Sequence, residues 1–113
     1  MSEPLIGRVT VSIDSKWRLW LGRRFLSRIG EEAVLFTSRS GKTLEIYPRS
    51  RLDALLSSGF EPENVFDVPL DRQGRALVPK SLRDIELFRC LSPDSLSVEI
   101  AGHGQYLEVR QHP

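Results

Sequence analysis

Apolar and polar residues alternate in two stretches of the chain, residues 8–14 (RVTVSID) and 65–71 (VFDVPLD). A period of two places every second side chain on one face, which predicts two half-buried β-strands. The apolar positions are Val9, Val11 and Ile13 in the first stretch, and Val65 or Phe66, Val68 and Leu70 in the second.

A tight turn, a short strand and a helix are predicted after each of these strands. In DRQGR, the Asp71 side chain can accept backbone N–H groups while Gly74 takes a positive φ. RALV then reads as a strand, and Pro79 suits the first position of a helix in which Leu82 and Ile85 share one face. After the first strand, Gly22 stands at the position that corresponds to Pro79. A helix is predicted to follow it in RRFLSRI and to end at Gly30.

The remaining segments predict four more strands and one more helix. AVLFT and TLEIY read as strands joined by a glycine-containing turn, and SLSVEI and QYLEV read as the last two strands. Between them, Pro48 begins a predicted helix over residues 48–58. Its apolar stripe of Leu52, Leu55 and Leu56 is interpreted as core or as a subunit interface.

The chain contains an internal repeat. Asp14 and Arg18 precede Asp71 and Arg75 by 57 positions, and GKTLEIY precedes GQYLEVR by 63. Apolar positions agree at the first offset: Val11 with Val68, Ile13 with Leu70, Leu21 with Val78, and Phe25 with Leu82. At 113 residues the chain has the size of one domain. We therefore expect a single compact domain of two halves, residues 5–59 and 65–113, with 60–64 as connector.

Charge is unevenly distributed although the net charge is only +1. Residues 8–51 carry ten basic and four acidic side chains, whereas residues 52–113 carry six basic and ten acidic ones. Surface charge fluctuates in short chains, but this division also fits one face that meets an anionic partner.

Several classes of function are not expected. Cys90 is the only cysteine and the two histidines lie far from it, so neither a disulfide nor a metal site is predicted. No nucleophile–base pair or phosphate-binding loop occurs, which argues against an enzyme, a cofactor or a small-molecule substrate. No apolar stretch approaches the ~20 residues of a membrane span, and MSEPLIGR is unlike a signal peptide, so a cytoplasmic protein is expected.

Asp71, Arg75, Pro79 and Arg83 form the pattern D-x-x-x-R-x-x-x-P-x-x-x-R. With the repeat and the LEIYP strand, this resembles the MraZ family, which has two tandem SpoVT/AbrB-type halves. The resemblance covers essentially the whole chain. It implies a mainly β fold with short helices (α+β), arranged as a pseudo-two-fold β-barrel of interleaved hairpins. It also implies ring-like oligomers that bind tandem promoter repeats of the division and cell-wall gene cluster, as nucleoid-associated transcriptional regulators.

This chain departs from the family pattern in its first copy and in its length. Trp17 stands where the family has glycine, Gly22 where it has proline, and Leu26 where it has the last arginine. The long helical segments usual between the halves and at the C-terminus of the family have no counterpart. The chain therefore resembles a short and divergent member.

The predicted DNA-binding residues lie in and beside the two turns. Arg18 and Arg75 each present a planar fork that suits phosphate or guanine, and Asp14 and Asp71 could orient these forks. Alternatively, each Asp–Arg pair only holds its own turn. Lys16, Arg23 and Arg24 add charge near Arg18, whereas Arg83 contacts DNA or forms a structural bridge. Because its half is basic, Arg18 is expected to read DNA and Arg75 to act on folding or assembly.

The chain contains two tryptophans, Trp17 and Trp20. Trp20 lies in a short strand and is expected to be buried, whereas Trp17 could stack on DNA or on a neighbouring subunit.

Double-stranded DNA and further copies of the chain are the expected partners. The alternative is an AbrB-type antitoxin or an oligomeric protein-binding scaffold without DNA binding.

Overall fold

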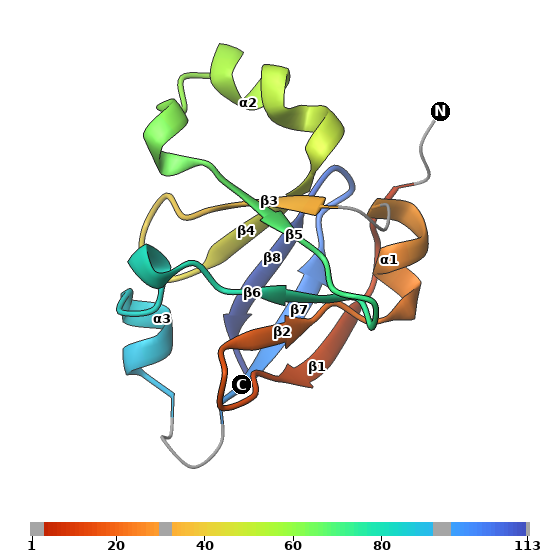
Figure 1. Ribbon diagram of the computed structural model, residues 1–113, viewed down its shortest axis with the longest axis vertical. Helices are drawn as coiled ribbons and strands as arrows, with labels where there is room; N and C mark the ends of the chain where they lie inside the picture. The colour runs from red at the N-terminus through yellow and green to blue at the C-terminus, as the bar shows by residue number, and fades with distance from the viewer. Residues whose placement is uncertain (1–3, 30–32, 92–95, 113) are drawn as a thin grey trace.

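Six antiparallel strands form one sheet in the computed structural model, which describes residues 4–29, 33–91 and 96–112 (Figure 1). The order across the sheet is β1-β7-β8-β4-β3-β5. The strands are β1 (Arg8–Ser12), β7 (Ser97–Gly102), β8 (Leu107–Gln111), β4 (Leu44–Pro48), β3 (Ala33–Thr37) and β5 (Phe66–Pro69). All six were predicted from the alternation and the turn residues.

A separate two-stranded ribbon lies in front of this sheet (Figure 1). It consists of β2 (Arg18–Trp20) and β6 (Arg75–Leu77), which are antiparallel with Leu19 opposite Ala76. Only single bridges, Ile13 to Leu19 and Leu70 to Ala76, connect the ribbon with the ends of the two edge strands. Among the described residues the strands therefore do not close a barrel, although the fold is mainly β with short helices.

In the described part of the chain, three short helices and three 3₁₀ turns complete the fold. The helices are α1 (Arg23–Ile29), α2 (Leu52–Ser57) and α3 (Glu86–Arg89), and the 3₁₀ turns are Arg49–Arg51, Pro62–Asn64 and Lys80–Leu82. Gly30, expected to end α1, lies outside the described residues. None of the described helices is long and apolar enough to cross a membrane.

The helix predicted after Pro79 was wrong in its extent. The chain makes one 3₁₀ turn and is then extended at Ile85, so that Leu82 and Ile85 do not share a helical face. The Leu87 backbone N–H donates to the Gly41 carbonyl at 2.9 Å, and Leu87 and Phe88 are buried. A long-range contact therefore fixes the short helix α3 that follows, which local periodicity could not indicate.

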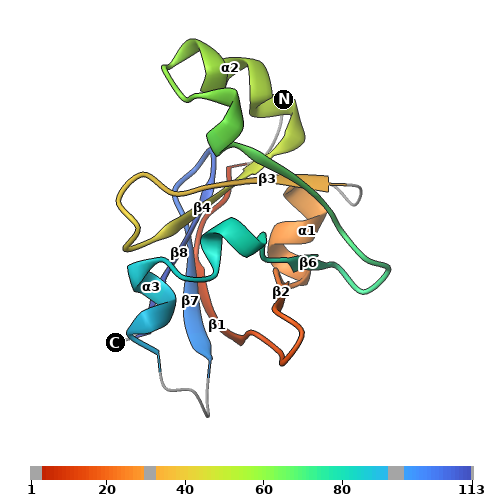
Figure 2. The same ribbon diagram turned by 60° about the vertical axis from the view of Figure 1, so that its left-hand side comes forward.

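The main core lies between the sheet and the elements on one side of it, the ribbon, α1 and α3. Figure 2 shows β2, β6 and α1 together on one side of β7 and β8. The apolar residues matched by the 57-residue offset are buried in this core, apart from Leu70, which is half-buried. The buried ones are Val11, Ile13, Leu21, Phe25, Val68, Val78 and Leu82. The periodicity of the repeat thus corresponds to positions that face the core.

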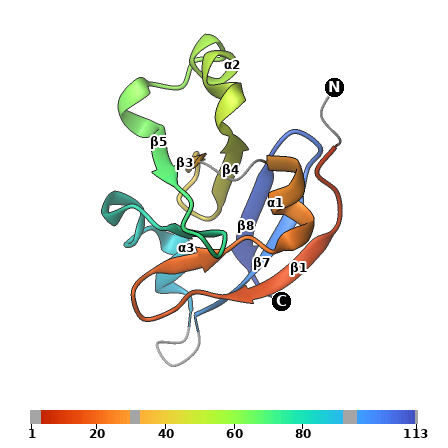
Figure 3. The same cartoon turned by 45° about the vertical axis from the view of Figure 1, so that its right-hand side comes forward.

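A second, smaller apolar cluster lies on the opposite face of the sheet, under α2. It consists of Leu35, Tyr47 and Leu55, with Phe60, Val65 and Tyr106 packed around them. Figure 3 shows α2 beside β3, β4 and β5, away from α1. Leu55 of the predicted stripe is thus core, whereas Leu52 and Leu56 are 37% and 36% exposed.

The two stretches of sequence on either side of residues 60–64 share one sheet. Strands β1, β3 and β4 come from the first stretch and β5, β7 and β8 from the second, and the sheet order intermixes them. The radius of gyration of 13.0 Å is that of one compact unit of this length. Neither stretch therefore has a sheet of its own.

Candidate nucleic-acid interface

The first turn, residues 14–18, is held by the Asp14 carboxylate. Its Oδ1 accepts the backbone N–H groups of Lys16 and Arg18, both at 2.9 Å, and its Oδ2 accepts the Arg18 Nε–H at 2.6 Å. The Trp17 N–H donates to the Asp14 carbonyl at 3.0 Å. One carboxylate therefore fixes both the backbone of the turn and the direction of the arginine.

The second turn, residues 71–75, has the same bonds. Asp71 Oδ1 accepts the N–H groups of Gln73 and Arg75 at 2.9 and 2.8 Å, and Oδ2 accepts Arg75 Nε–H at 2.8 Å. The Gly74 N–H donates to the Asp71 carbonyl at 3.0 Å. Each Asp–Arg pair therefore holds its own turn.

Both carboxylates are kept ionised by these bonds. The pKa of Asp14 is lowered, chiefly by the hydrogen bond from the Arg18 backbone N–H, with the Arg18 side chain adding to it against the effect of desolvation. The pKa of Asp71 is lowered in the same way by Arg75. Because the aspartates bind Nε, terminal nitrogens of both guanidinium groups remain for other acceptors, although Nη1 of Arg75 lies near Asp14.

The two arginines belong to one surface, the outer face of the β2–β6 ribbon. Leu19 and Ala76 are fully buried opposite each other, so the residues on either side of them point outward. Arg18 lies opposite Leu77, and Trp20 lies opposite Arg75. Arg75 also reaches across, with its Nη1 3.8 Å from Oδ2 of Asp14.

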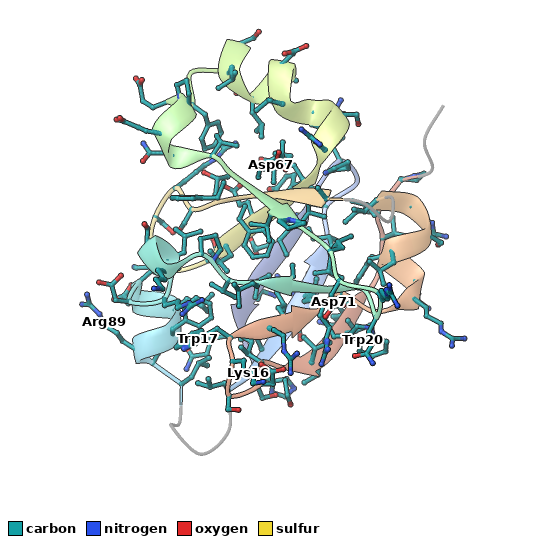
Figure 4. The ribbon with its side chains drawn as sticks, viewed as in Figure 1. Lys16, Trp17, Trp20, Asp67, Asp71 and Arg89 are labelled. Atoms are coloured by element: carbon teal, nitrogen blue, oxygen red, sulfur yellow. The ribbon has the colours of Figure 1, made fainter. Side chains whose placement is uncertain are left out.

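The expectation that Trp20 is buried was wrong. Trp20 is 45% exposed and Leu77 is 48% exposed, whereas the side chains of Arg18 and Arg75 are 33% and 27% exposed. In a three-residue strand with a period of two, only the central residue faces the core, and in β2 this is Leu19. Figure 4 shows Trp20 beside Asp71 at one end of the ribbon, and Lys16 and Trp17 at the other.

Trp17 packs inside the chain rather than outward. Its ring meets the Phe88 ring edge to face at 5.2 Å, and the Arg83 guanidinium lies 5.6 Å from its centroid. Arg83 also donates from Nε to the Val78 carbonyl at 2.8 Å, so it forms the structural bridge that was one of its two predicted roles. Leu26 of α1 packs directly against Gly74 in the second turn.

The other predicted basic residues surround the ribbon. Lys16 is exposed in the first turn, and Arg23 and Arg24 are exposed at the start of α1. Arg23 and Trp20 border a hollow whose opposite wall is the turn at residues 71–74, with Arg72 among its lining residues. Sequence reasoning missed Trp20, Leu77 and Arg72 as residues of this surface, although strict alternation within each short strand could have identified Leu77.

At the ribbon, residues of the basic and the acidic halves of the sequence lie together. Arg72 and Arg75 belong to the acidic half of the sequence but lie beside Trp20 of the basic half. This geometry therefore gives no basis for assigning DNA recognition to Arg18 alone and folding or assembly to Arg75. The two halves contribute to one surface.

A scan against known protein-family models gives no match for this chain. In the described residues, no group of three histidine, cysteine or acidic side chains is placed to hold a metal ion.

Proposed function

We propose that this protein is a sequence-specific DNA-binding transcriptional regulator that resembles the MraZ family. The observation that carries the proposal is the ribbon face, on which each of two arginines is oriented by its own ionised aspartate. Such pre-organised forks suit the paired acceptors O6 and N7 of guanine, or two phosphate oxygens.

The dimensions of the ribbon favour the major groove of DNA. Two paired strands lie roughly 4.8 Å apart, and the groove, about 12 Å wide, admits a two-stranded ribbon with its side chains. Arg18 and Arg75 are proposed to contact base edges or nearby phosphates, with Asp14 and Asp71 as positioning residues. Lys16, Arg23 and Arg24 are proposed to contact phosphates. Arg83 supports the ribbon through Val78 and Trp17.

The proposal extends to the architecture and the assembly. We propose that the chain consists of two tandem AbrB/MraZ-like halves with pseudo-two-fold symmetry, and that it forms a ring-like oligomer in the cytoplasm at the nucleoid. Its targets would be tandem promoter repeats, as in the division and cell-wall cluster. A few arginines bind weakly at physiological salt, so several subunits on repeated sites are needed to raise the effective concentration.

Fluorescence anisotropy with duplexes from the chain's own upstream promoter tests this function. Arg18→Ala and Arg75→Ala should each abolish the preference for the promoter duplex over a scrambled one, because each removes a fork from the same face. Arg24→Ala should weaken both duplexes equally and reduce the salt slope by about one unit.

Arg89→Ala is the matched control, because Arg89 is an exposed arginine on α3, away from the ribbon (Figure 4). It should bind like the unmodified protein. Thermal melts of all variants establish that they fold. Folded Arg18→Ala and Arg75→Ala variants that keep full preference for the promoter would refute the proposed interface.

An AbrB-type antitoxin or protein-binding scaffold is the second candidate. The exposed Leu52 and Leu56 on α2 favour it, because adjacent apolar side chains on a surface helix suit a protein partner. In that case no duplex would bind in preference to its scrambled form, whatever the variant.

A further inference from the structure

We infer that Trp20 and Leu77 are specificity-determining residues that contact thymine methyl groups in the major groove, beside guanines bound by Arg18 and Arg75. The inference rests on the proposed DNA-binding function and deepens it. It assigns a role to two apolar side chains that the Asp–Arg motif does not include.

The placement of the four side chains is the starting point. Across the ribbon, Arg18 faces Leu77 and Trp20 faces Arg75, so each arginine has one apolar neighbour on the opposite strand and one two residues along its own strand. Directly opposed Cβ atoms lie roughly 5 Å apart, and residues two apart on a strand lie roughly 6.6 Å apart. The face is therefore a small grid of alternating cationic and apolar groups.

Both apolar side chains are open to a ligand. Trp20 is 45% exposed and Leu77 48% exposed, although the strands that carry them also contribute fully buried residues to the core. Trp20 also borders the hollow beside the turn at residues 71–74. A partner that reaches the two guanidinium groups must therefore also cover Trp20 and Leu77.

The chemistry of the major groove selects thymine at such positions. The C5-methyl of thymine is the apolar group that the groove offers, whereas cytosine and adenine present amino donors and guanine presents acceptors. Covering a donor or acceptor with an indole or leucine side chain leaves it without a hydrogen bond, which is unfavourable. With base pairs about 3.4 Å apart along each strand, the grid predicts target sites in which guanine lies within about two steps of thymine.

A second copy of the chain fits this surface less well than DNA does. The two apolar groups are separated by arginines and do not form a continuous patch, which protein interfaces prefer at their centres. Both arginines already have an aspartate partner, so a protein surface would have to supply further acceptors at two separate points. The major groove supplies acceptors and methyl groups side by side.

The test uses DNA in which deoxyuridine replaces thymidine. Duplexes that bind the unmodified protein are selected from a randomised library, and the best is prepared in both forms. The exchange removes the C5-methyl group and leaves base pairing unchanged. Binding should weaken about fourfold for each contacted methyl, the ratio that corresponds to one buried carbon group. Leu77→Ala and Trp20→Ala should bind the thymidine duplex more weakly and discriminate less between the two forms.

Ile6→Ala is the control, because Ile6 is an exposed apolar residue outside both the ribbon and α2; it should retain full discrimination. Thermal melts and light scattering accompany each variant. If thymidine and deoxyuridine duplexes bind equally while the preference for guanine-containing sites persists, the methyl contacts are refuted and the proposed function stands. If Leu77→Ala lowers the oligomer mass instead, the surface is a subunit contact and the inference is wrong. If no duplex is selected at all, the proposed function fails and the inference with it.

Discussion

Position 17 holds a tryptophan with a φ of +62°, whereas the equivalent residue of the other turn is Gly74 at +77°. A left-handed backbone is unfavourable for a bulky residue. In this chain the Trp17 ring packs on Phe88 and under Arg83, and these contacts offset the strain. At the other turn, a Cβ on Gly74 would collide with the Leu26 side chain. Residues 17 and 26, which differ from Gly74 and Arg83 at the matching positions of the repeat, therefore have separate packing reasons.

Gly74→Ala should destabilise the protein more than Gly41→Ala does. Both glycines have a positive φ, +77° and +78°, but a Cβ on Gly41 would meet no atom within 4 Å. A left-handed alanine costs roughly 1–2 kcal/mol at either position, and overpacking against Leu26 adds about 1–3 kcal/mol at Gly74 alone. Urea unfolding of each variant measures the free energies.

A double-mutant cycle identifies the cause. In a Leu26→Ala background, the Gly74→Ala penalty should fall to that of Gly41→Ala, because the colliding side chain is gone. Equal penalties for the two single variants would mean that Leu26 moves aside freely.

At the scale of elements, strands β4 and β7 each place one buried glutamate on the face of the sheet opposite the main core. Glu45 and Glu99 are each only 6% exposed. Glu45 lies opposite Glu108, and its nearest cation is Arg39, whose Nε is 3.1 Å from a carboxylate oxygen that accepts no well-aligned hydrogen bond. Glu99 lies opposite Arg110 and accepts two hydrogen bonds from it, at 2.9 and 2.6 Å.

These surroundings move the two pKa values in opposite directions. Burial raises the pKa of Glu45, opposed by Arg39. The hydrogen bonds from Arg110 lower the pKa of Glu99. Because the pKa of Glu99 is lower in the folded state, the ionised side chain stabilises the fold at pH values above the unfolded pKa of 4.5. This contribution is lost as the pH falls through the pKa of the folded state. For Glu45, whose pKa is raised in the folded state, the ionised side chain instead lowers the stability of the fold at neutral pH.

Glu45→Gln and Glu99→Gln should therefore change stability at pH 7 in opposite directions. The Glu45 variant should melt at the same or a higher temperature than the unmodified protein, and this gain should disappear as the pH falls below the raised pKa. The Glu99 variant should melt lower at pH 7, and the difference should close at acid pH. Thermal melts between neutral and acid pH provide the measurement.

Each variant serves as the control for the other, since both replace a glutamate of equal exposure, on the two strands that flank β8. Destabilisation of both variants to the same degree at pH 7 would show that the ion pair with Arg39 outweighs the burial of Glu45.

At the scale of the whole molecule, we predict that the protein is an oligomer in solution. Leu52 and Leu56 lie one helical turn apart on α2 and remain 37% and 36% exposed, whereas Leu55 between them is core. Light scattering should give a mass of several subunits at micromolar concentration. The double variant Leu52→Lys with Leu56→Lys should have a lower mass and should bind repeated DNA sites more weakly, because avidity is lost.

The Ile6→Lys variant is the control, because Ile6 is 59% exposed and lies outside α2. The oligomer mass of this variant should equal that of the unmodified protein. A monomeric mass for the unmodified protein would remove the argument from avidity, while leaving the contacts of a single ribbon with DNA to be tested separately.

The sequence by itself determined the strands, the two turns and most of the core. Alternation with a period of two predicted β1 and β5, and the Asp–Arg spacing predicted both turns, because these features depend on neighbours within about five residues. The matched positions of the repeat, such as Leu21 and Val78, are buried as their apolar character indicates. Local stereochemistry and hydrophobicity suffice for such features.

Only the tertiary structure decided which strands pair and which side chains meet on one surface. The sheet order places strands from distant parts of the chain side by side, such as β1 and β7, and the ribbon places Arg75 opposite Trp20 across more than fifty residues. It also decided that Leu19 rather than Trp20 faces the core, and that α3 begins after an extended residue. These outcomes depend on which long-range packing buries the most apolar surface while pairing every strand, and no short stretch of sequence contains that information.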